Sequence, residues 1–179
     1  MVIIFPTDTV YGIGCPIFDV EGIDKIYEIK KRSKDKPLAC LFSNIEQMED
    51  ICYLDSNAIK LINKYLPGPL TIIVKAKDKL VEKIGYKTLG IRIPNNKIAL
   101  SILDKYGPML TTSVNDSGEE PINEYKKIKE KYNDLVDEIY DNNEELSKVS
   151  STVISLVDGF KILRNGEIKE EDIKELLGD

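Results

Sequence analysis

The sequence predicts an α/β fold built on a mixed sheet in which some neighbouring strands are antiparallel. Short apolar runs alternate with amphipathic segments along the chain, and this alternation is typical of α/β proteins. Two of the apolar runs flank Asp158-Gly159, which favours a hairpin and therefore an antiparallel pair. The length of 179 residues suits one domain, because domains commonly span roughly 100–200 residues. We therefore expect residues 1–179 to form a single domain.

The strands are predicted from apolar runs of four to six residues, a length that is typical of strands. Turn-forming or charged residues separate most of these runs. In chain order the predicted strands are Val2–Phe5, Leu38–Phe42, Leu70–Lys75, Leu89–Ile93, Met109–Ser113, Thr152–Val157 and Phe160–Leu163.

The helices are predicted from apolar residues at helical spacing and from capping residues. Asn44 can cap the second helix, and Asp55 or Ser56 can cap the third. Acidic residues open the last helix, where the helix dipole favours negative charge. The predicted helices are Gly22–Lys31, Ile45–Ile51, Asn57–Tyr65, Ile98–Tyr106, 124–132 and Glu170–Leu177.

The composition excludes several classes of protein. An apolar content of 42% is too high for wholesale disorder, and no apolar run approaches the ~20 residues needed to cross a bilayer. The first residues, Met1–Pro6, lack a basic lead and make a poor signal peptide, so we expect a cytoplasmic protein. The chain has no histidine, which excludes Ser-His-Asp and Cys-His catalysis.

The three cysteines, Cys15, Cys40 and Cys52, cannot all pair, and none lies in a CxxC spacing. We expect reduced and mostly buried thiols. Zinc ligands would have to come from scattered thiols and carboxylates, so we predict no metal site built by the protein.

The net charge of −6 is unevenly distributed along the chain. Acidic residues concentrate in segments 119–150 and 167–179, so the remainder of the chain is net positive. A protein that binds nucleic acid through a broad surface is usually basic overall. We therefore expect a local basic site for a small anion rather than a surface that binds a duplex.

The chain has three arginines, Arg32, Arg92 and Arg164, among 25 basic residues. Each lies at the end of a predicted strand or helix, beside glycine, proline or hydroxyl residues. A guanidinium is a planar fork that binds phosphate or carboxylate through two hydrogen bonds. Their placement indicates anion binding, although a structural ion pair would account for any single one of them equally well.

Four segments combine polar side chains with glycines or clustered charge. Each also has an ordinary structural interpretation as a turn or a solvated helix cap, and none is a Walker loop or a GxGxxG fingerprint. The functional interpretations are a site for a small polar ligand in PTDTVYGIG, a phosphate clamp in KKRSKDKP, and a set of hydroxyl and amide donors in SVNDSG. The segments are PTDTVYGIG (6–14), KKRSKDKP (30–37), SVNDSG (113–118), and SSTV (150–153) with ILRNG (162–166).

In this order, and together with LPGPLTIIV (66–74) and GIRIPN (90–95), these motifs resemble the YrdC family of threonylcarbamoyl-AMP synthases. The resemblance extends from about Phe5 to Gly166. In particular, Lys30-x-Arg32 and Ser113-x-Asn115 match the KxR and SxN signatures of the family. The resemblance implies a single-domain YrdC-like fold, with a twisted mixed sheet, flanking helices and a deep basic cleft.

The resemblance also implies an enzyme, a nucleotidyltransferase that condenses L-threonine, bicarbonate and ATP to threonylcarbamoyl-AMP and pyrophosphate. A tRNA threonylcarbamoyltransferase complex would then be the downstream partner, and contact of this chain with tRNA would be weak or indirect. The attacking carbamate is already anionic, so catalysis would consist mainly of alignment and neutralisation of phosphate charge. Mg²⁺ would bind mainly through the phosphates of ATP.

The resemblance assigns roles to individual positions. Lys30 and Arg32 would form the catalytic basic clamp. The residues expected to contact ATP are Arg32, Lys36, Thr88, Ser113, Asn115 and Arg164. Those expected to hold threonine are Thr9, Tyr11, Arg92, Thr111 and Ser151, with Arg92 as the partner of the α-carboxylate.

The sequence departs from the family pattern in three places. It begins almost at the first motif, so we expect the usual preceding helix to be absent and the cleft to be more open. Asp141–Glu145 replaces a glycine-rich stretch, and Leu38–Leu41 lacks a histidine that some relatives carry. Two alternatives stay open: a YrdC-like protein that binds nucleotide or RNA without synthase activity, and a carbamoyl-adenylate-handling domain.

Overall fold

The computed structural model describes residues 1–178. Its strands are β1 (Ile3–Phe5), β2 (Gly12–Pro16), β3 (Ala39–Leu41), β4 (Leu70–Lys75), β5 (Thr88–Arg92), β6 (Met109–Ser113), β7 (Glu138–Ile139), β8 (Thr152–Ser155) and β9 (Lys161–Arg164). Its helices are α1 (Val20–Ile29), α2 (Ile45–Ile51), α3 (Ser56–Tyr65), α4 (Asp78–Ile84), α5 (Lys97–Tyr106), α6 (Tyr125–Tyr132) and α7 (Glu170–Leu177). Every predicted strand and helix is present, with ends that differ by at most two residues.

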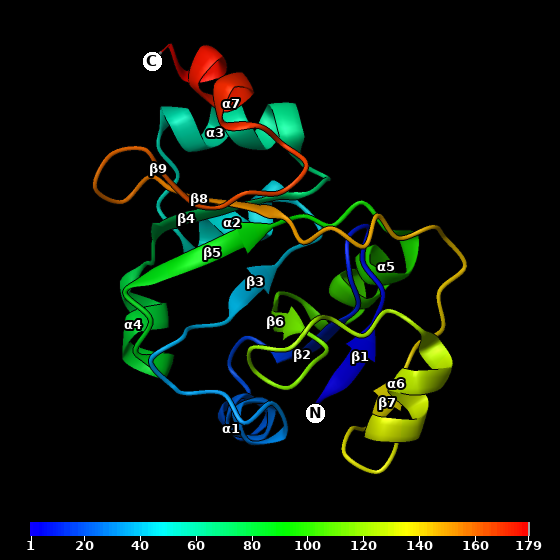
Figure 1. Cartoon of the computed structure of the whole chain (residues 1–179). Helices are drawn as coiled ribbons and strands as arrows, with labels where there is room; N and C mark the ends of the chain where they lie inside the picture. Colours follow the sequence, from blue (N-terminus) through cyan, green and yellow to red (C-terminus); the bar gives the residue numbers. More distant parts are fainter. Residues whose placement is uncertain (179) are drawn as a thin grey trace.

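Within the described residues the strands form one nine-stranded sheet, in the order β7-β1-β2-β6-β3-β5-β4-β8-β9 (Figure 1). The pairs β1–β7, β3–β5 and β4–β8 are parallel, and the other five pairs are antiparallel. Strands β8 and β9 form the antiparallel pair that the Asp158-Gly159 signal predicts. The α/β fold with a mixed sheet is therefore confirmed.

Three elements are not predicted from the sequence: β2, α4 and β7. The glycines and the proline of β2 favour a turn in a sequence-based reading. In the structure β2 is nevertheless a buried strand between β1 and β6. Helix α4 is short and ends at Ile84, and Gly85 after it has the left-handed φ of 76° that suits a glycine. Strand β7 has only two residues.

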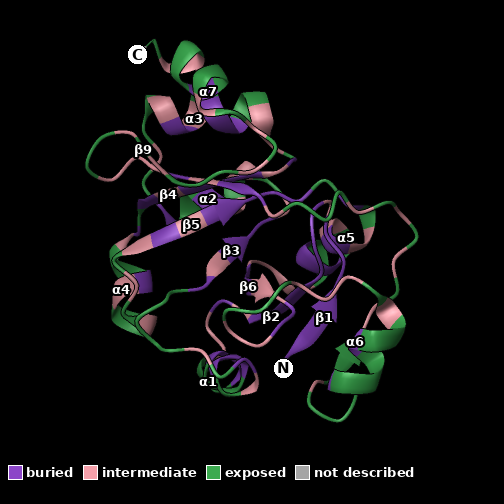
Figure 2. Cartoon of the chain, viewed as in Figure 1, coloured by how far each residue is buried: buried purple, intermediate pink, exposed green. Residues whose placement is uncertain are grey.

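The two faces of the sheet have different surroundings, because successive side chains of a strand point to opposite faces. One face presents Cys40, Ile72, Ile91, Leu110 and Ile154, which are fully buried in the larger apolar core. Strand β1 and much of β3 and β5 are coloured as buried in Figure 2. Their neighbours in each strand lie on the opposite face. The larger core thus packs against one face of the sheet, and the opposite face can line a cavity.

Helix α5 covers one end of that opposite face. Its residues Ala99, Ile102 and Leu103 pack with Phe5 and Met109 in a second apolar cluster. Asn96 caps this helix by accepting the N–H of Ala99 at 3.0 Å. The remainder of the face carries the cavity described below.

Helix α1 ends in a turn that separates the two basic side chains of the KxR motif. The N–H of Arg32 donates to Tyr27 O at 2.9 Å and that of Lys31 to Glu28 O at 3.1 Å, which is the Schellman pattern of helix ends. Lys31 has a φ of 50°, the left-handed conformation that glycine usually takes there. The turn leaves Lys30 buried and directs Arg32 to the cavity.

Candidate functional site

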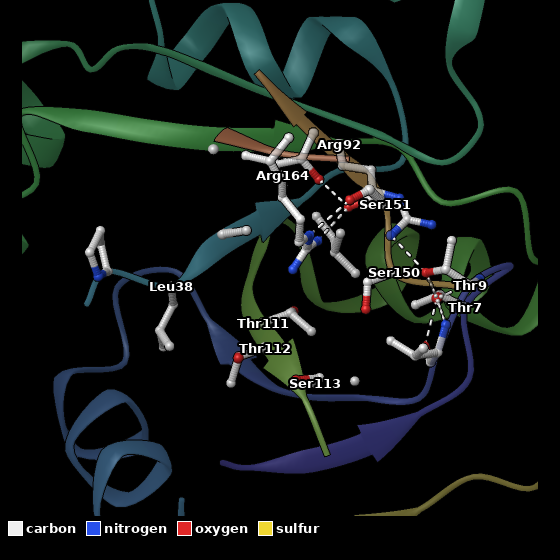
Figure 3. Close-up of a pocket in the computed structure, with 18 of the residues that line it drawn as sticks. Thr7, Thr9, Leu38, Arg92, Thr111, Thr112, Ser113, Ser150, Ser151 and Arg164 are labelled. Carbon is white, nitrogen blue, oxygen red and sulfur yellow. Dashed lines mark hydrogen bonds between the residues drawn. The ribbon is translucent and has the colours of Figure 1, made fainter. Parts of the chain in front are cut away.

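A cavity of about 340 Å³ lies on the face of the sheet that carries α5 (Figure 3). Residues two apart line it on five neighbouring strands or at their ends, as expected of side chains on one face. These pairs are Ala39 and Leu41, Thr71 and Ile73, Gly90 and Arg92, Thr111 and Ser113, and Ser151 and Val153. The loop after β1, Thr7–Tyr11, contributes a further wall.

The cavity brings together most of the predicted site residues. Those that line it are Thr9, Tyr11, Arg32, Arg92, Thr111, Ser113, Ser151 and Arg164. All three arginines of the chain are among them. No carboxylate within residues 1–178 lines the cavity, so its lining favours an anionic ligand.

Two glycines of β2 make room for Thr111 beside the cavity. A Cβ atom at Gly12 would lie 2.6 Å from Thr111 Cγ2, and one at Gly14 would lie 2.7 Å from Thr111 Oγ1. Either side chain would have to displace Thr111. The glycines of PTDTVYGIG therefore serve close packing between two strands, and not the turn that the sequence suggests.

Three acceptors from two segments, the loop after β1 and the turn before β4, hold the guanidinium of Arg92. Its Nε donates to Gly68 O at 2.9 Å, its Nη1 to Thr9 Oγ1 at 3.0 Å and its Nη2 to Asp8 Oδ1 at 2.6 Å. Burial lowers the pKa of Arg92, and Asp8 acts in the opposite direction. A guanidinium has five N–H groups, so two of them remain for a ligand.

Arg164 approaches the cavity from β9 and is tied to Ser151. Its Nε donates to Ser151 O and its Nη2 to Ser151 Oγ, both at 3.0 Å. The Ser151 hydroxyl also shares a hydrogen bond of 2.8 Å with Thr71. Burial and then the charge of Arg92 lower the pKa of Arg164. Because the two guanidiniums repel each other, an anion between them would be stabilised.

Arg32 reaches the cavity from the loop that follows α1. Its Nε donates to Lys36 O at 3.0 Å and its Nη2 to Pro37 O at 3.2 Å. The Tyr27 hydroxyl donates to the same Lys36 carbonyl at 3.0 Å. These bonds brace the basic loop, and the Arg32 guanidinium keeps N–H groups free for a ligand.

The ammonium of Lys30 lies behind the SxN loop and does not line the cavity within the described chain. The residue is 2% exposed, and its Nζ donates to Ser113 O at 2.5 Å, Asn115 O at 2.8 Å and Asn115 Oδ1 at 2.6 Å. An ammonium can only donate, so it orients the Asn115 amide. The Ser113 hydroxyl donates to the same Oδ1 at 2.8 Å. The sequence prediction places Lys30 in the catalytic basic clamp, whereas in the structure its ammonium supports the SxN loop.

Three predicted ATP contacts, Lys36, Thr88 and Asn115, do not line the cavity among residues 1–178. Thr88 lies on the cavity face, two residues before Gly90 in β5. Lys36 is exposed, and Asn115 is buried next to Lys30. Their contacts with ATP stay predictions.

Several polar residues at the site receive no role from the sequence, among them Thr7, Asp8 and Thr71. Thr7 Oγ1 donates to Val10 O at 2.7 Å and accepts the N–H of Thr9 at 3.1 Å, which shapes the loop after β1. Asp8 and Thr7 belong to the PTDT motif, which is the signal that could have indicated them. Thr71 resembles any strand residue, and its role follows only from its position beside Ser151.

Deprotonation of Lys30 is expected to weaken ATP binding as the pH rises above about 8. Burial, followed by the charge of Arg32, lowers the pKa of Lys30 from 10.5 to about 8. The neutral amine has two N–H groups for three acceptors, so the SxN loop loses one hydrogen bond. Between about pH 8 and pH 10.5 the unfolded chain keeps this proton while the folded chain loses it. The contribution of Lys30 to the free energy of unfolding therefore increases with pH over this range.

Calorimetric titration of ATP at about pH 7 and about pH 9.5 tests this expectation, with the melting temperature recorded at both. Weaker binding at the higher pH without a loss of folded protein agrees with it. Equal affinity at both pH values contradicts the role given to the Lys30 ammonium.

No helix within residues 1–178 is long and apolar enough to cross a membrane. Over the same range no group of three cysteine or carboxylate side chains could hold a metal ion. Cys15, Cys40 and Cys52 are free and buried, as predicted.

Comparison with known proteins agrees with the motifs. A family model for Sua5, YciO and YrdC proteins, described as "Telomere recombination", matches residues 1–166. The threonylcarbamoyl-AMP synthase of Bacillus subtilis strain 168 is 33% identical over 183 residues, which cover 99% of this chain and 53% of that protein.

Solved structures agree with the fold. The crystal structure of Pyrococcus abyssi Sua5 in complex with L-threonine matches with a TM-score of 0.90 at 30% identity, over 99% of this chain and 54% of that one. The structure of Escherichia coli YciO matches with a TM-score of 0.84 at 29% identity, over 94% of this chain and 84% of that one. The chain spans about half the length of the B. subtilis and P. abyssi proteins. The resemblance drawn from the motifs is confirmed: the chain belongs to the Sua5/YciO/YrdC family.

Proposed function

We propose that this chain is an L-threonylcarbamoyladenylate synthase, which converts L-threonine, bicarbonate and ATP to threonylcarbamoyl-AMP and pyrophosphate. The observation that carries the proposal is a cavity lined by three arginines and several hydroxyls, with no carboxylate from residues 1–178. The B. subtilis relative bears the name of this enzyme, and P. abyssi Sua5 binds L-threonine. The cavity would then be the basic cleft that the motifs predict.

The reaction suits a site without a protein nucleophile. The threonine amine and the carbon of bicarbonate form a carbamate, and water leaves. A carbamate oxygen attacks the α-phosphorus of ATP, and pyrophosphate departs with the electrons of the broken P–O bond. The protein contributes alignment and positive charge. Arginines and hydroxyls supply both, and the absence of histidine from the sequence is no obstacle.

The charges of the three arginines support separate positions for the two substrates. Arg92 is paired with Asp8 at 2.6 Å, so it suits the single charge of an amino-acid carboxylate. Within residues 1–178, the hydrogen bonds of Arg32 and Arg164 go only to carbonyl and hydroxyl oxygens. Their charges are therefore free to meet the phosphates of ATP.

The SxN loop supports contacts with the nucleoside part of ATP. The Ser113 proton is engaged with Asn115 Oδ1, so Ser113 offers a lone pair, which suits the adenine amino group or a ribose hydroxyl. Lys30 and Asn115 act here by holding Ser113. Mg²⁺ would arrive on the phosphates and neutralise charge there, because the cavity lining contains no carboxylate within residues 1–178.

The product implies a place in tRNA modification. Threonylcarbamoyl-AMP is an activated mixed anhydride, so its threonylcarbamoyl group can pass to a nucleophile with release of AMP. We propose that a tRNA threonylcarbamoyltransferase complex in the cytoplasm catalyses this transfer to tRNA. Direct contact of this chain with tRNA would be weak, which agrees with its net charge of −6.

Lysine substitutions at two arginines are expected to separate the two substrates. Arg92→Lys should mainly raise the KM for threonine, because a point charge replaces a fork held by three acceptors. Arg164→Lys should mainly raise the KM for ATP. Steady-state kinetics with each substrate varied in turn would show this pattern. A rise in the ATP requirement alone in both variants would contradict the position given to the threonine carboxylate.

Selectivity among amino acids is expected to follow both the methyl and the hydroxyl of threonine. Serine lacks the methyl and should be a poor but detectable substrate, because one methyl contact is worth roughly 10- to 200-fold in specificity. Valine keeps the shape but leaves a polar group of the site unpaired, so it should be worse. Thr9 and Ser151 are the expected partners of the substrate hydroxyl. Valine competing as well as threonine would remove that role from both residues.

Identification of the adenylate tests the proposed function directly. The chain, incubated with ATP, Mg²⁺, bicarbonate and L-threonine, should yield a product with the mass of threonylcarbamoyl-AMP. Labelled bicarbonate should appear in that product. A protein that binds ATP but forms no adenylate would instead be a nucleotide-binding member of the family.

A further inference from the structure

A carboxylate lies just outside the cavity, against the guanidinium of Arg92. Asp8 Oδ1 accepts from Arg92 Nη2 at 2.6 Å and from the backbone N–H of Asn95 at 3.0 Å. The exposed fractions of the two side chains are 16% for Asp8 and 7% for Arg92. Within the described residues Asp8 does not line the cavity, so a direct contact with substrate is not expected.

The backbone around Asp8 is anchored to a segment distant in sequence. The carbonyl of Asp8 accepts the N–H of Ser147 at 3.1 Å, and that of Thr9 accepts the N–H of Lys148 at 2.9 Å. The carboxylate itself is held by the N–H of Asn95, just before α5. These hydrogen bonds fix the position of Asp8. By contrast, the ion pair of Lys34 and Asp24 is exposed on the surface.

Arg92 depends on Asp8 for the orientation of its guanidinium. Its guanidinium is buried, and its other two partners, Gly68 O and Thr9 Oγ1, are neutral. Removal of the Asp8 oxygen leaves one end of the buried fork without its hydrogen-bond acceptor, so the guanidinium is free to reorient. A guanidinium binds a carboxylate through two hydrogen bonds only when both groups lie in a common plane.

We propose that Asp8 is a positioning residue for threonine, which turns the Arg92 fork so that its two free N–H groups meet the amino-acid carboxylate. This inference rests on the proposed function, because it takes threonine as the ligand of Arg92. It adds a role for the acidic residue of the PTDT motif, which acts through Arg92 and without touching the substrate.

Kinetics of two Asp8 variants would test the role. Asp8→Ala should raise the KM for threonine at least ~10-fold, the effect of losing a charged hydrogen bond, and leave the KM for ATP within about twofold. Asp8→Asn keeps an oxygen acceptor for both Arg92 and Asn95, so its KM for threonine should stay within about threefold of the wild type. Rescue by asparagine is a result that a role in charge balance alone would not give.

Asp24→Ala is the matched control, because it removes an acid from an exposed ion pair and should leave both KM values unchanged. If Asp8→Ala does not fold, Asp8→Ser replaces it, since the shorter side chain does not reach Arg92. An unchanged KM for threonine in the folded variant would overturn the proposal. Parallel rises in both KM values would do the same, because they would indicate a structural ion pair.

The threonine-induced rise in melting temperature separates this inference from the proposed function. The wild type should show the rise, and Asp8→Ala should lose most of it. A wild type without the rise would count against threonine as the ligand. If Asp8→Ala keeps the full rise, the positioning role of Asp8 is wrong, and the proposed function is unaffected.

Discussion

Replacement of Lys30 by methionine is expected to weaken ATP binding by roughly 10- to 100-fold, because three buried acceptors lose their donor. These acceptors, Ser113 O and the two oxygens of Asn115, belong to the SxN loop. The fold should persist, because burial of the ammonium is itself unfavourable. The lowered pKa of Lys30, about 8, is a sign of that cost. Loss of the charge therefore offsets part of the lost hydrogen bonding.

Calorimetric titration of ATP and hydrogen exchange of residues 113–119 would measure both consequences. The loop amides should exchange faster, while those of the central strands β5 and β6 should keep their protection. Lys34→Met is the matched control, because it removes the same charge from the same segment at a side chain that is 70% exposed. ATP affinity equal to that of the wild type in Lys30→Met would contradict the role given to this lysine.

Arg32→Ala should nearly abolish adenylate formation. A lost charged hydrogen bond to phosphate costs roughly 1.5–3 kcal/mol in binding, or about 10- to 150-fold. The same change removes the bonds to Lys36 O and Pro37 O that brace the basic loop. The melting temperature should change little, because Arg32 lies beyond the end of α1 and is only half-buried.

Arg32→Lys serves as the companion variant, and it should retain part of the activity because it keeps the charge and loses the planar fork. Pyrophosphate release at saturating ATP and threonine would rank the three proteins. Wild-type activity in Arg32→Ala would remove Arg32 from the site.

The fold was largely predictable because most elements have their own local signals. Asn44 caps α2 and Asp55 caps α3, as their positions indicate. Strand β2 is the unpredicted element that matters most for the site, and its glycines favour a turn when the sequence is considered alone. Its strand conformation depends on partners from distant parts of the chain, β1 and β6. Sequence alone does not show that Thr111 fills the space beside these glycines.

The composition of the site was predictable to a similar degree, and the roles of its residues less so. Arg92, Ser113 and Ser151 meet at one cavity because they lie on, or next to, strands in one part of the sheet (β5, β6 and β8), with their side chains on one face. Lys30 and Arg32 look alike in the sequence, but the turn after α1 sends them to different places. Asp8 acquires its role from Arg92, 84 positions away in the sequence.

We propose that the three arginines gather threonine, bicarbonate and ATP for one reaction. The most direct test of this proposal is pyrophosphate release from ATP by the purified chain, measured with each of the other two substrates omitted in turn. We expect release only when L-threonine and bicarbonate are both present, with one adenylate formed per pyrophosphate. Release that is independent of threonine, or no release with all three substrates at saturation, would contradict it.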